Sequence, residues 1–249
     1  MRRKTMLITG ASSGIGAALA ELAASEGWDI GLNYRADEAA AKEVAAKAEA
    51  AGAKVALLPG DVSNAQDVER MFTRFDAELG QLDALINNAG IVGEASRVED
   101  LPKERLERMF AVNVLGSIYC AQEAVRRMAH RHGGKGGSIV NVSSVAARLG
   151  SAGEYVDYAA SKGAIDTFSK GLADENARDG IRVNVLRPGI TATPLHAKGG
   201  APGREERLKD KIPMGRPGEA REIAEAILWL ASDRASYVTG AFLDASGGR

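Results

Sequence analysis

The stretch "TGASSGIG" at residues 9–16 decides the fold. It follows a short apolar segment, "TMLIT" at 5–9, and leads directly into the helical pattern "GAALAELAAS". Gly10 permits a tight turn, while Gly14 and Gly16 permit a close approach of the backbone. Free N–H groups and the positive end of a helix dipole then face the same point. A strand, a glycine-rich turn and a helix in this order predict a binding site for the phosphates of a dinucleotide.

The rest of the chain continues the alternation of short strands and longer helices. Several predicted strands are continuously apolar, which is typical of strands covered on both faces. Helical patterns such as "EAAAKEVAAKAEAAG" and "EIAEAILWLAS" separate them. The sequence therefore predicts an α/β protein with a doubly wound Rossmann fold, a seven-stranded parallel sheet with helices on both faces. Besides 5–9, the predicted strands are residues 29–33, 54–58, 84–87, 138–142, 181–186 and 241–245.

No linker rich in proline, glycine or serine divides the chain, and no internal repeat is present. One α/β domain can hold a chain of 249 residues, so we expect a single domain over residues 1–249. The segment 194–213 interrupts the α/β alternation with polar and glycine residues. We expect this segment to form a mobile loop over the substrate.

Composition and charge narrow the class of protein. The formal net charge is −1, without an extended basic block, so nothing electrostatic indicates a nucleic acid partner. No apolar run approaches the length that spans a membrane, and the chain opens on a strand pattern without a signal peptide. A single cysteine, Cys120, excludes an internal disulfide, and the three histidines belong to no metal-ligand set. We expect a cytoplasmic protein without a metal ion or a membrane partner.

The end of the second predicted strand bears on the choice of coenzyme. NAD-binding folds often place an acid there to bind the ribose 2′-hydroxyl, but this chain has Tyr34 followed by Arg35. A guanidinium can pair with a 2′-phosphate through two hydrogen bonds. These residues favour NADP(H), with NAD(H) as the alternative, and Ser12 and Asn33 are candidate helpers. In the alternative, Arg35 is an ordinary solvated loop residue, and Asp37 or Glu38 could neutralise its charge.

A second site is indicated by "YAASK" at 158–162. The pKa of free tyrosine, about 10, is too high for a base at neutral pH, and a nearby ammonium lowers it. Residues four apart share one face of a helix, so Lys162 can act on Tyr158, although this spacing also recurs by chance. "NVSSV" at 141–145 ends a predicted strand, where α/β folds hold their ligands. Its Ser144 could hydrogen-bond the same substrate oxygen as Tyr158. A third polar group at this place makes a catalytic role for the tyrosine–lysine pair better supported than a chance spacing.

Two further features support a site at these strand ends. "NNAG" at 87–90 ends another predicted strand, and its amides could support a cofactor. Asn113 is a polar residue within the apolar stretch "AVNVLG". A buried polar side chain needs a partner, and a proton-relay water is one candidate.

Taken together, these residues resemble the short-chain dehydrogenase/reductase family, in its classical subgroup. The resemblance covers essentially the whole chain, and it extends to the 3-oxoacyl-carrier-protein reductase and glucose 1-dehydrogenase-like groups. It implies a homotetramer or a homodimer. The motifs that carry it, in order, are "TGASSGIG" at 9–16, "DV" at 61–62, "NNAG" at 87–90, Asn113, Ser144, Tyr158 with Lys162, "RPG" at 187–189 and "YVTGAFLDASGG" at 237–248.

The resemblance implies hydride transfer between a nicotinamide and the carbonyl or alcohol carbon of a small-molecule substrate. Tyr158 is implied as the general acid in reduction and the base in oxidation, and Lys162 as the residue that lowers its pKa. Ser144 would polarise the substrate oxygen, and Asn113 would hold a relay water. The expected cofactor contacts are Gly10, Ser12, Ser13, Gly14, Ile15, Gly16, Asn33, Tyr34, Arg35, Asp61, Val62, Asn88, Ala89, Gly90, Tyr158, Lys162, Pro188, Gly189, Ile190 and Thr193.

Two features depart from the pattern of the family. Ser144 precedes Tyr158 by 14 residues, one more than is common, so Ser143 stays an alternative. Ser13 stands where some NADP-using members carry a basic residue, which leaves Arg35 to bind the phosphate. Two other functions stay open: a catalytically idle sensor or scaffold that binds NADP(H), and a nucleotide-binding methyltransferase. Neither would need the tyrosine–lysine pair.

Overall fold

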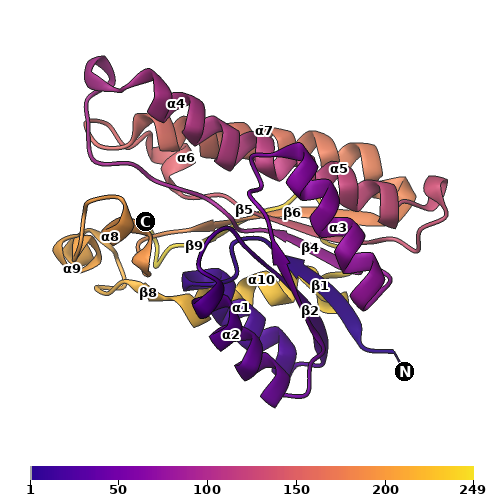
Figure 1. Cartoon of the computed structure of the whole chain (residues 1–249). Coiled ribbons are helices and arrows are strands. Elements are labelled where there is room, and N and C mark those ends of the chain that lie inside the picture. The colour runs from indigo at the N-terminus through magenta and orange to yellow at the C-terminus, as the bar shows by residue number, and fades with distance from the viewer. Residues whose placement is uncertain (1) are drawn as a thin grey trace.

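The computed structural model describes residues 2–249, apart from the side chains of His196 and Lys198. Seven parallel strands form one sheet in the order β3-β2-β1-β4-β5-β6-β9, and this confirms the predicted fold (Figure 1). The strand order reverses between β1 and β4, which is where doubly wound sheets open a crevice. The strands are β1 (Lys4–Ile8), β2 (Trp28–Tyr34), β3 (Val55–Pro59), β4 (Ala84–Asn87), β5 (Gly137–Val142), β6 (Ile181–Pro188) and β9 (Phe242–Ala245).

Helices cover both faces of the sheet, as Figure 1 shows. One face carries α1 (Gly14–Ser25), α2 (Glu38–Ala50) and α10 (Ala220–Ala231). The opposite face carries α3 (Ala65–Leu79), α5 (Gly116–Met128) and α7 (Val156–Asn176).

The central strand β1 contributes side chains to two hydrophobic cores, one on each face of the sheet. Met6 and Ile8 belong to the core beneath α1 and α10, while Leu7 belongs to the core beneath α3 and α5. All three side chains are fully buried, since successive residues of a strand point to opposite faces. A strand in this position must be apolar throughout, which is the pattern that the sequence shows.

The long helical region between β4 and β5 is divided in the structure. α4 (Lys103–Phe110) passes through a π-helical turn at Ala111–Leu115 and continues as α5. Such turns insert one residue into the helical register and are often found at functional sites. Asn113 lies in the middle of this turn.

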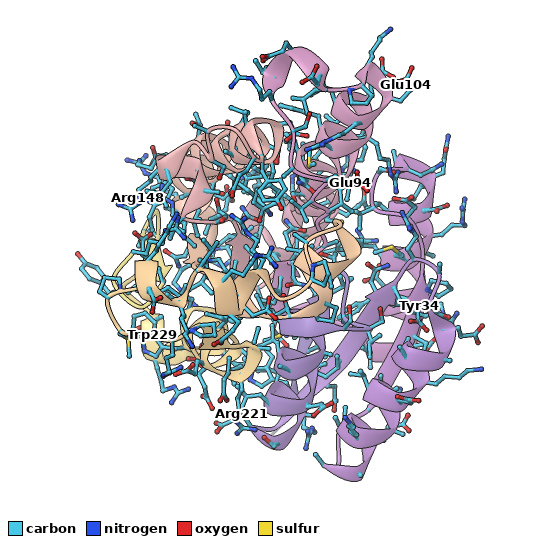
Figure 2. All side chains as sticks on the ribbon, turned by 90° about the vertical axis from the view of Figure 1, so that its left-hand side faces the viewer. Tyr34, Glu94, Glu104, Arg148, Arg221 and Trp229 are labelled. Atoms are coloured by element: carbon cyan, nitrogen blue, oxygen red, sulfur yellow. The ribbon has the colours of Figure 1, made fainter. Side chains whose placement is uncertain are left out.

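The carboxyl ends of the strands carry several short elements. They are α6 (Ala146–Leu149), α8 (Pro194–Lys198), α9 (Arg204–Arg207) and a two-stranded sheet of β7 (Thr191–Ala192) and β8 (Gly218–Glu219). Figure 2 looks onto this end, where the pale orange segment with α8 and α9 crosses the middle and Glu94 lies above it. A Cβ on Gly200 would stand 2.9 Å from Glu94 Cγ, so this segment packs against the loop after β4. Within residues 2–249, no helix is both long enough and apolar enough to cross a bilayer.

Candidate active site

A cavity of about 710 Å³ opens at the carboxyl ends of the strands. Its walls come from the glycine-rich turn and the ends of β2 and β3 on one side, and from β5, β6, α7 and the segment 194–211 on the other. Gly16, Tyr34 and Asn113 are predicted site residues that do not line it. The predicted residues that line it are Gly10, Ser12, Ser13, Gly14, Ile15, Asn33, Arg35, Asp61, Val62, Asn88, Ala89, Gly90, Ser144, Tyr158, Lys162, Pro188, Gly189, Ile190 and Thr193.

The glycine-rich turn fits a diphosphate. Gly10 and Gly14 have φ angles of 63° and 58°, which side chains other than glycine rarely adopt. A Cβ on Gly16 would stand 2.5 Å from the Gly10 carbonyl oxygen and 2.6 Å from Asn88 Nδ2, so the start of α1 must be glycine to pack here. Ser13 is the N-cap residue of α1 but makes no capping hydrogen bond with its side chain. The first amides of α1 therefore remain available to an anion.

Asn33 supports this turn from within the protein. Its Oδ1 accepts a hydrogen bond from Gly10 N at 3.1 Å, and its Nδ2 donates to Leu58 O at 2.9 Å and Gly60 O at 3.1 Å. The side chain is almost completely buried. Asn33 thus ties the turn to the end of β3, and these three hydrogen bonds engage its amide within the protein.

Tyr34 and Arg35 separate at the end of β2. Tyr34 is buried in the core beneath α1 and α2, and its label in Figure 2 lies well to the right of α8 and α9. Arg35 is exposed and lines the cavity. Among residues 2–249 its side chain forms no hydrogen bond or ion pair. Asp37 caps α2 by accepting from Ala40 N at 3.0 Å, and Glu38 pairs with Lys42 at 2.8 Å. The two acids therefore bond elsewhere, and the alternative in which they neutralise Arg35 is not found.

Arg108 on α4 is a cavity residue that the sequence analysis missed. Its Nη2 donates to Asp61 Oδ2 at 2.7 Å and its Nη1 donates to Ser63 Oγ at 2.6 Å. Burial acts to raise the pKa of Asp61, but hydrogen bonds from Ser63 and Arg108 outweigh it and hold that pKa below its usual value. The "DV" motif at 61–62 is thereby anchored to α4.

The structure distinguishes the two candidate serines. Ser143 is buried, and its hydroxyl donates to the backbone oxygen of Lys162 at 3.2 Å. Ser144 lines the cavity and accepts a hydrogen bond from Ala146 N at 3.1 Å, and its hydroxyl acts to lower the pKa of Tyr158. Ser144 is therefore the serine that faces Tyr158, and the extra residue before the tyrosine is accommodated in the intervening loop.

Lys162 lies close behind Tyr158 on α7. Its Nζ donates to Val142 O at 2.8 Å and stands 5.6 Å from the centre of the Tyr158 ring. Burial lowers the pKa of Lys162 to about 8, although Asp166 acts in the opposite direction.

The pKa of Tyr158 moves in the direction opposite to the prediction. Burial raises it to about 12, and the hydrogen bond with Ser144 opposes this rise only in part. Burial removes hydration that stabilises the phenolate, and the hydrogen bonds and charges of the neighbouring groups replace only part of that stabilisation. Tyr158 consequently holds its proton at neutral pH in this structure.

Asn113 lies behind Lys162, outside the cavity lining. Its Oδ1 accepts from Ile91 N at 2.8 Å, and its Nδ2 donates to Ile91 O at 3.0 Å and Ser161 Oγ at 3.1 Å. A Cβ on Gly90 would stand 3.4 Å from Asn113 Oδ1 and 3.5 Å from Lys162 Nζ. These two atoms are therefore at most about 7 Å apart, a separation that one or two water molecules can bridge.

A buried ion pair that the sequence analysis missed holds the start of α7. Arg105 on α4 donates two hydrogen bonds to Asp157, at 2.8 Å and 3.1 Å. The side chain of Asp157 has no exposed surface, and Asp157 directly precedes Tyr158. Breaking a buried pair on one side leaves an uncompensated charge, so this contact fixes α7, and with it Tyr158, against α4.

The fold and the site first define a class of protein. A doubly wound parallel sheet carries a glycine-rich turn at the start of α1, and the turn and the tyrosine–lysine pair line the same crevice. This is a Rossmann-type protein whose crevice is built to hold a dinucleotide.

Comparisons with known proteins identify the family. A family model described as enoyl-(acyl carrier protein) reductase matches residues 10–249. The uncharacterized oxidoreductase YgfF of Escherichia coli is 54% identical over 243 residues, which cover 98% of each chain. Glucose 1-dehydrogenase of Gluconobacter oxydans is 39% identical over 98% of this chain and 91% of its own. The solved structure of a Serratia marcescens short-chain dehydrogenase/reductase mutant superposes with a TM-score of 0.90 at 34% identity, covering 98% of this chain and 97% of that one.

The chain belongs to the short-chain dehydrogenase/reductase family. It is an oxidoreductase, and membership of the family implies a nicotinamide dinucleotide, NAD(P), as its cofactor. This assignment contradicts the methyltransferase alternative.

Proposed function

We propose that the protein transfers hydride between NADP(H) and a small-molecule carbonyl compound or secondary alcohol, with Tyr158 as the general acid and base. The observation that carries this proposal is that Ser144 and Tyr158 line the same cavity as the glycine-rich turn, with the Ser144 hydroxyl near enough to act on the pKa of Tyr158. An idle NADP(H) sensor of the same fold would need the turn but not this pair of hydroxyls. Catalysis is therefore the better supported function.

The two hydroxyls suit the proton transfer that reduction requires. When bound, the nicotinamide supplies or accepts the hydride. A carbonyl oxygen placed beside Ser144 and Tyr158 would accept a hydrogen bond from each, which polarises the carbonyl bond. Since the pKa of Tyr158 is about 12, the phenol enters the reaction with its proton. The proton then moves from Tyr158 Oη to the substrate oxygen as negative charge develops there.

Neighbouring groups stabilise the phenolate that remains. The Lys162 ammonium and the Ser144 hydroxyl both favour the charged form of Tyr158. In the oxidative direction the same groups would favour the phenolate as a base. Asn113 Oδ1 lies at most about 7 Å from Lys162 Nζ, so a water held between them would return a proton to the site through Lys162.

The proposed preference for NADPH rests on Arg35. Its guanidinium lines the cavity at the end of β2, and the nearest acids in the sequence, Asp37 and Glu38, are bonded to a helix cap and to Lys42. An unpaired guanidinium attracts a 2′-phosphate and offers it two hydrogen bonds.

Arg35→Ala is expected to weaken NADPH binding by about 10- to 100-fold, the effect of losing charge-assisted hydrogen bonds of about 1.5–3 kcal/mol. NADH binding should stay unchanged, because NADH lacks the phosphate. Fluorescence titration of the purified variants with both coenzymes measures the two affinities. Arg178→Ala, which removes an exposed arginine outside the cavity lining, is the matched control. Equal losses for NADPH and NADH would show that Arg35 does not bind the phosphate.

We also propose that each chain forms a single domain over residues 1–249 and that the protein is cytoplasmic. We further propose that four chains assemble into a homotetramer, with a homodimer as the alternative. Apolar side chains remain on the surface at Phe110, the last residue of α4, at Leu115 in the π-helical turn, and at Phe242 on the edge strand β9. Burial of such side chains favours association. Analytical ultracentrifugation should give a mass of four chains, and a mass of one chain at micromolar concentration would contradict association.

A further inference from the structure

The cavity extends past Tyr158 to a wall that contains Arg204. Arg204 lies on α9, lines the cavity, and has a side chain that is only 13% exposed. Its guanidinium stands 4.9 Å from the centre of the Tyr155 ring. Tyr155 is the N-cap residue of α7, and Tyr158 follows about one helical turn later, a rise of about 5 Å. Arg204 and Tyr158 therefore line one cavity from elements that meet at the start of α7.

The protein uses only part of the hydrogen-bonding capacity of Arg204. Its Nη2 donates to Glu154 Oε2 at 2.6 Å. Nε is buried without a hydrogen-bond partner among residues 2–249, and Nη1 donates to none of them. A guanidinium has five N–H donors in a rigid fork, and leaving a charged donor unsatisfied in a buried position is costly. An acceptor from outside the chain would remove that cost.

Charge at this wall also favours an anion. Lys211 and Arg249 line the cavity next to Arg204, and Glu154 is the one carboxylate side chain among the described residues that line this end. The hydrogen bond from Arg204, together with the charges of Arg204, Lys211 and Arg249, holds the pKa of Glu154 below its usual value against the effect of burial. The side chains that line this end carry three positive charges and one negative charge. The balance stays positive beside the terminal carboxylate of Arg249, and a positive field attracts negatively charged ligands.

We propose that Arg204 recognises an oxyanion group, a carboxylate or a phosphate, on the carbonyl substrate. This inference rests on the proposed function, since it assigns the substrate class of the same site. Stacking on Tyr155 holds the guanidinium in one orientation, as two-point recognition of an oxyanion requires. Because Arg204 and Tyr158 line the same cavity, one substrate can present its carbonyl to Tyr158 and its anionic group to Arg204.

A purely structural role for Arg204 makes a different prediction. The Arg204–Glu154 pair joins the segment 194–211 to the loop before α7, so the pair could act only as a tie between them. In that case Glu154→Gln and Arg204→Gln should have the same effect. If Arg204 binds an oxyanion, Glu154→Gln should instead strengthen binding of the anion, because it removes a competing carboxylate.

The test compares two ketones with their uncharged counterparts: levulinate with its methyl ester, and dihydroxyacetone phosphate with dihydroxyacetone. Each is titrated by calorimetry into protein saturated with NADP⁺, which cannot reduce a carbonyl, so binding is measured without turnover. We expect at least one charged ketone to bind about 10-fold or more tightly than its uncharged partner, the effect of a charge-assisted hydrogen bond. The pair that shows the larger ratio identifies the oxyanion.

The variants then assign this preference to one side chain. Arg204→Gln should abolish the preference, and Arg204→Lys should retain part of it. Arg207→Gln is the matched control on the same helix, because Arg207 is exposed and donates only to Pro202 O among the described residues. The proposal is overturned if charged and uncharged ketones bind equally, if no charged ketone binds, or if Glu154→Gln loses the preference as Arg204→Gln does.

Failure of the proposed function would be visible separately. Titration with NADP⁺ alone measures cofactor binding. A protein that does not bind NADP⁺ would contradict the proposed NADP(H)-dependent hydride transfer. The same four ketones can then be titrated into the free protein, where the charge preference still tests Arg204.

Discussion

Tyr158→Phe is expected to lower kcat for carbonyl reduction by at least about 100-fold, the contribution typical of a general acid, while the affinity for NADPH stays unchanged. The substitution keeps the ring that packs in the cavity and removes only the hydroxyl that Ser144 contacts. Steady-state reduction of a panel of ketones and aldehydes measures kcat, and fluorescence titration measures the affinity.

A surface tyrosine supplies the control for this experiment. Tyr237→Phe makes the same chemical change at a fully exposed position and should leave both quantities unaltered. Retention of turnover in Tyr158→Phe would contradict the assignment of the acid. An unmodified protein that binds NADPH tightly but reduces no member of the panel would instead support the idle sensor.

Lys162→Met is expected to lower kcat by about 100-fold and, at the same time, to stabilise the folded protein below pH 8. Methionine fills a similar volume without a charge, so the variant no longer places an ammonium in a buried site. Activity falls because the Tyr158 phenolate loses its cation.

The gain in stability follows from proton linkage. The pKa of Lys162 is lowered from 10.5 to about 8 in the folded protein, which corresponds to a cost of about 3 kcal/mol at 1.36 kcal/mol per pKa unit. Below pH 8 both states bind the proton and the full cost is present. Between pH 8 and 10.5 the unfolded chain binds more protons, so the free energy of unfolding rises with pH, and above 10.5 the cost is gone.

The difference between the variant and the unmodified protein should therefore be largest near neutral pH. Losing the hydrogen bond to Val142 O offsets about 1 kcal/mol of the gain, which leaves about 2 kcal/mol. Urea unfolding at about pH 7 and about pH 10 measures both values. Lys170→Met changes an exposed lysine on the same helix and should not alter the pH dependence. A Lys162→Met variant that is less stable than the unmodified protein at neutral pH, with an unchanged pH dependence, would contradict the buried charge.

Most of the fold was predictable because each strand of the sheet is a distinct apolar run bounded by helical patterns. β7 and β8 were missed, since two residues each are too few to show a period. The π-helical turn at 111–115 was also missed, because one inserted residue hardly alters the apolar pattern of a long helix. The segment 194–213 was expected to be irregular but contains α8 and α9.

The site was predictable where its chemistry is local in the sequence. The glycine-rich turn lies within eight consecutive residues, and Tyr158 and Lys162 lie one turn apart on α7. The contacts of Arg108 with Asp61, Arg105 with Asp157 and Arg204 with Glu154 span 47, 52 and 50 residues, and no spacing rule connects them. The raised pKa of Tyr158 was not predictable either, because it depends on burial that only the folded chain defines.

Asn33 has a consequence for redesign of the coenzyme preference. Its amide donates to two main-chain oxygens and accepts from the glycine-rich turn, a combination that an aspartate cannot reproduce, since a carboxylate would face the Leu58 and Gly60 carbonyl oxygens. Arg35, two positions later in the chain, forms no hydrogen bond or ion pair among the described residues, so its replacement breaks no contact within the protein. Laboratory evolution towards NADH should therefore accumulate changes from residue 35 onwards and leave Asn33 unchanged. Asn33 holds the glycine-rich turn in place, whereas Arg35 selects the coenzyme.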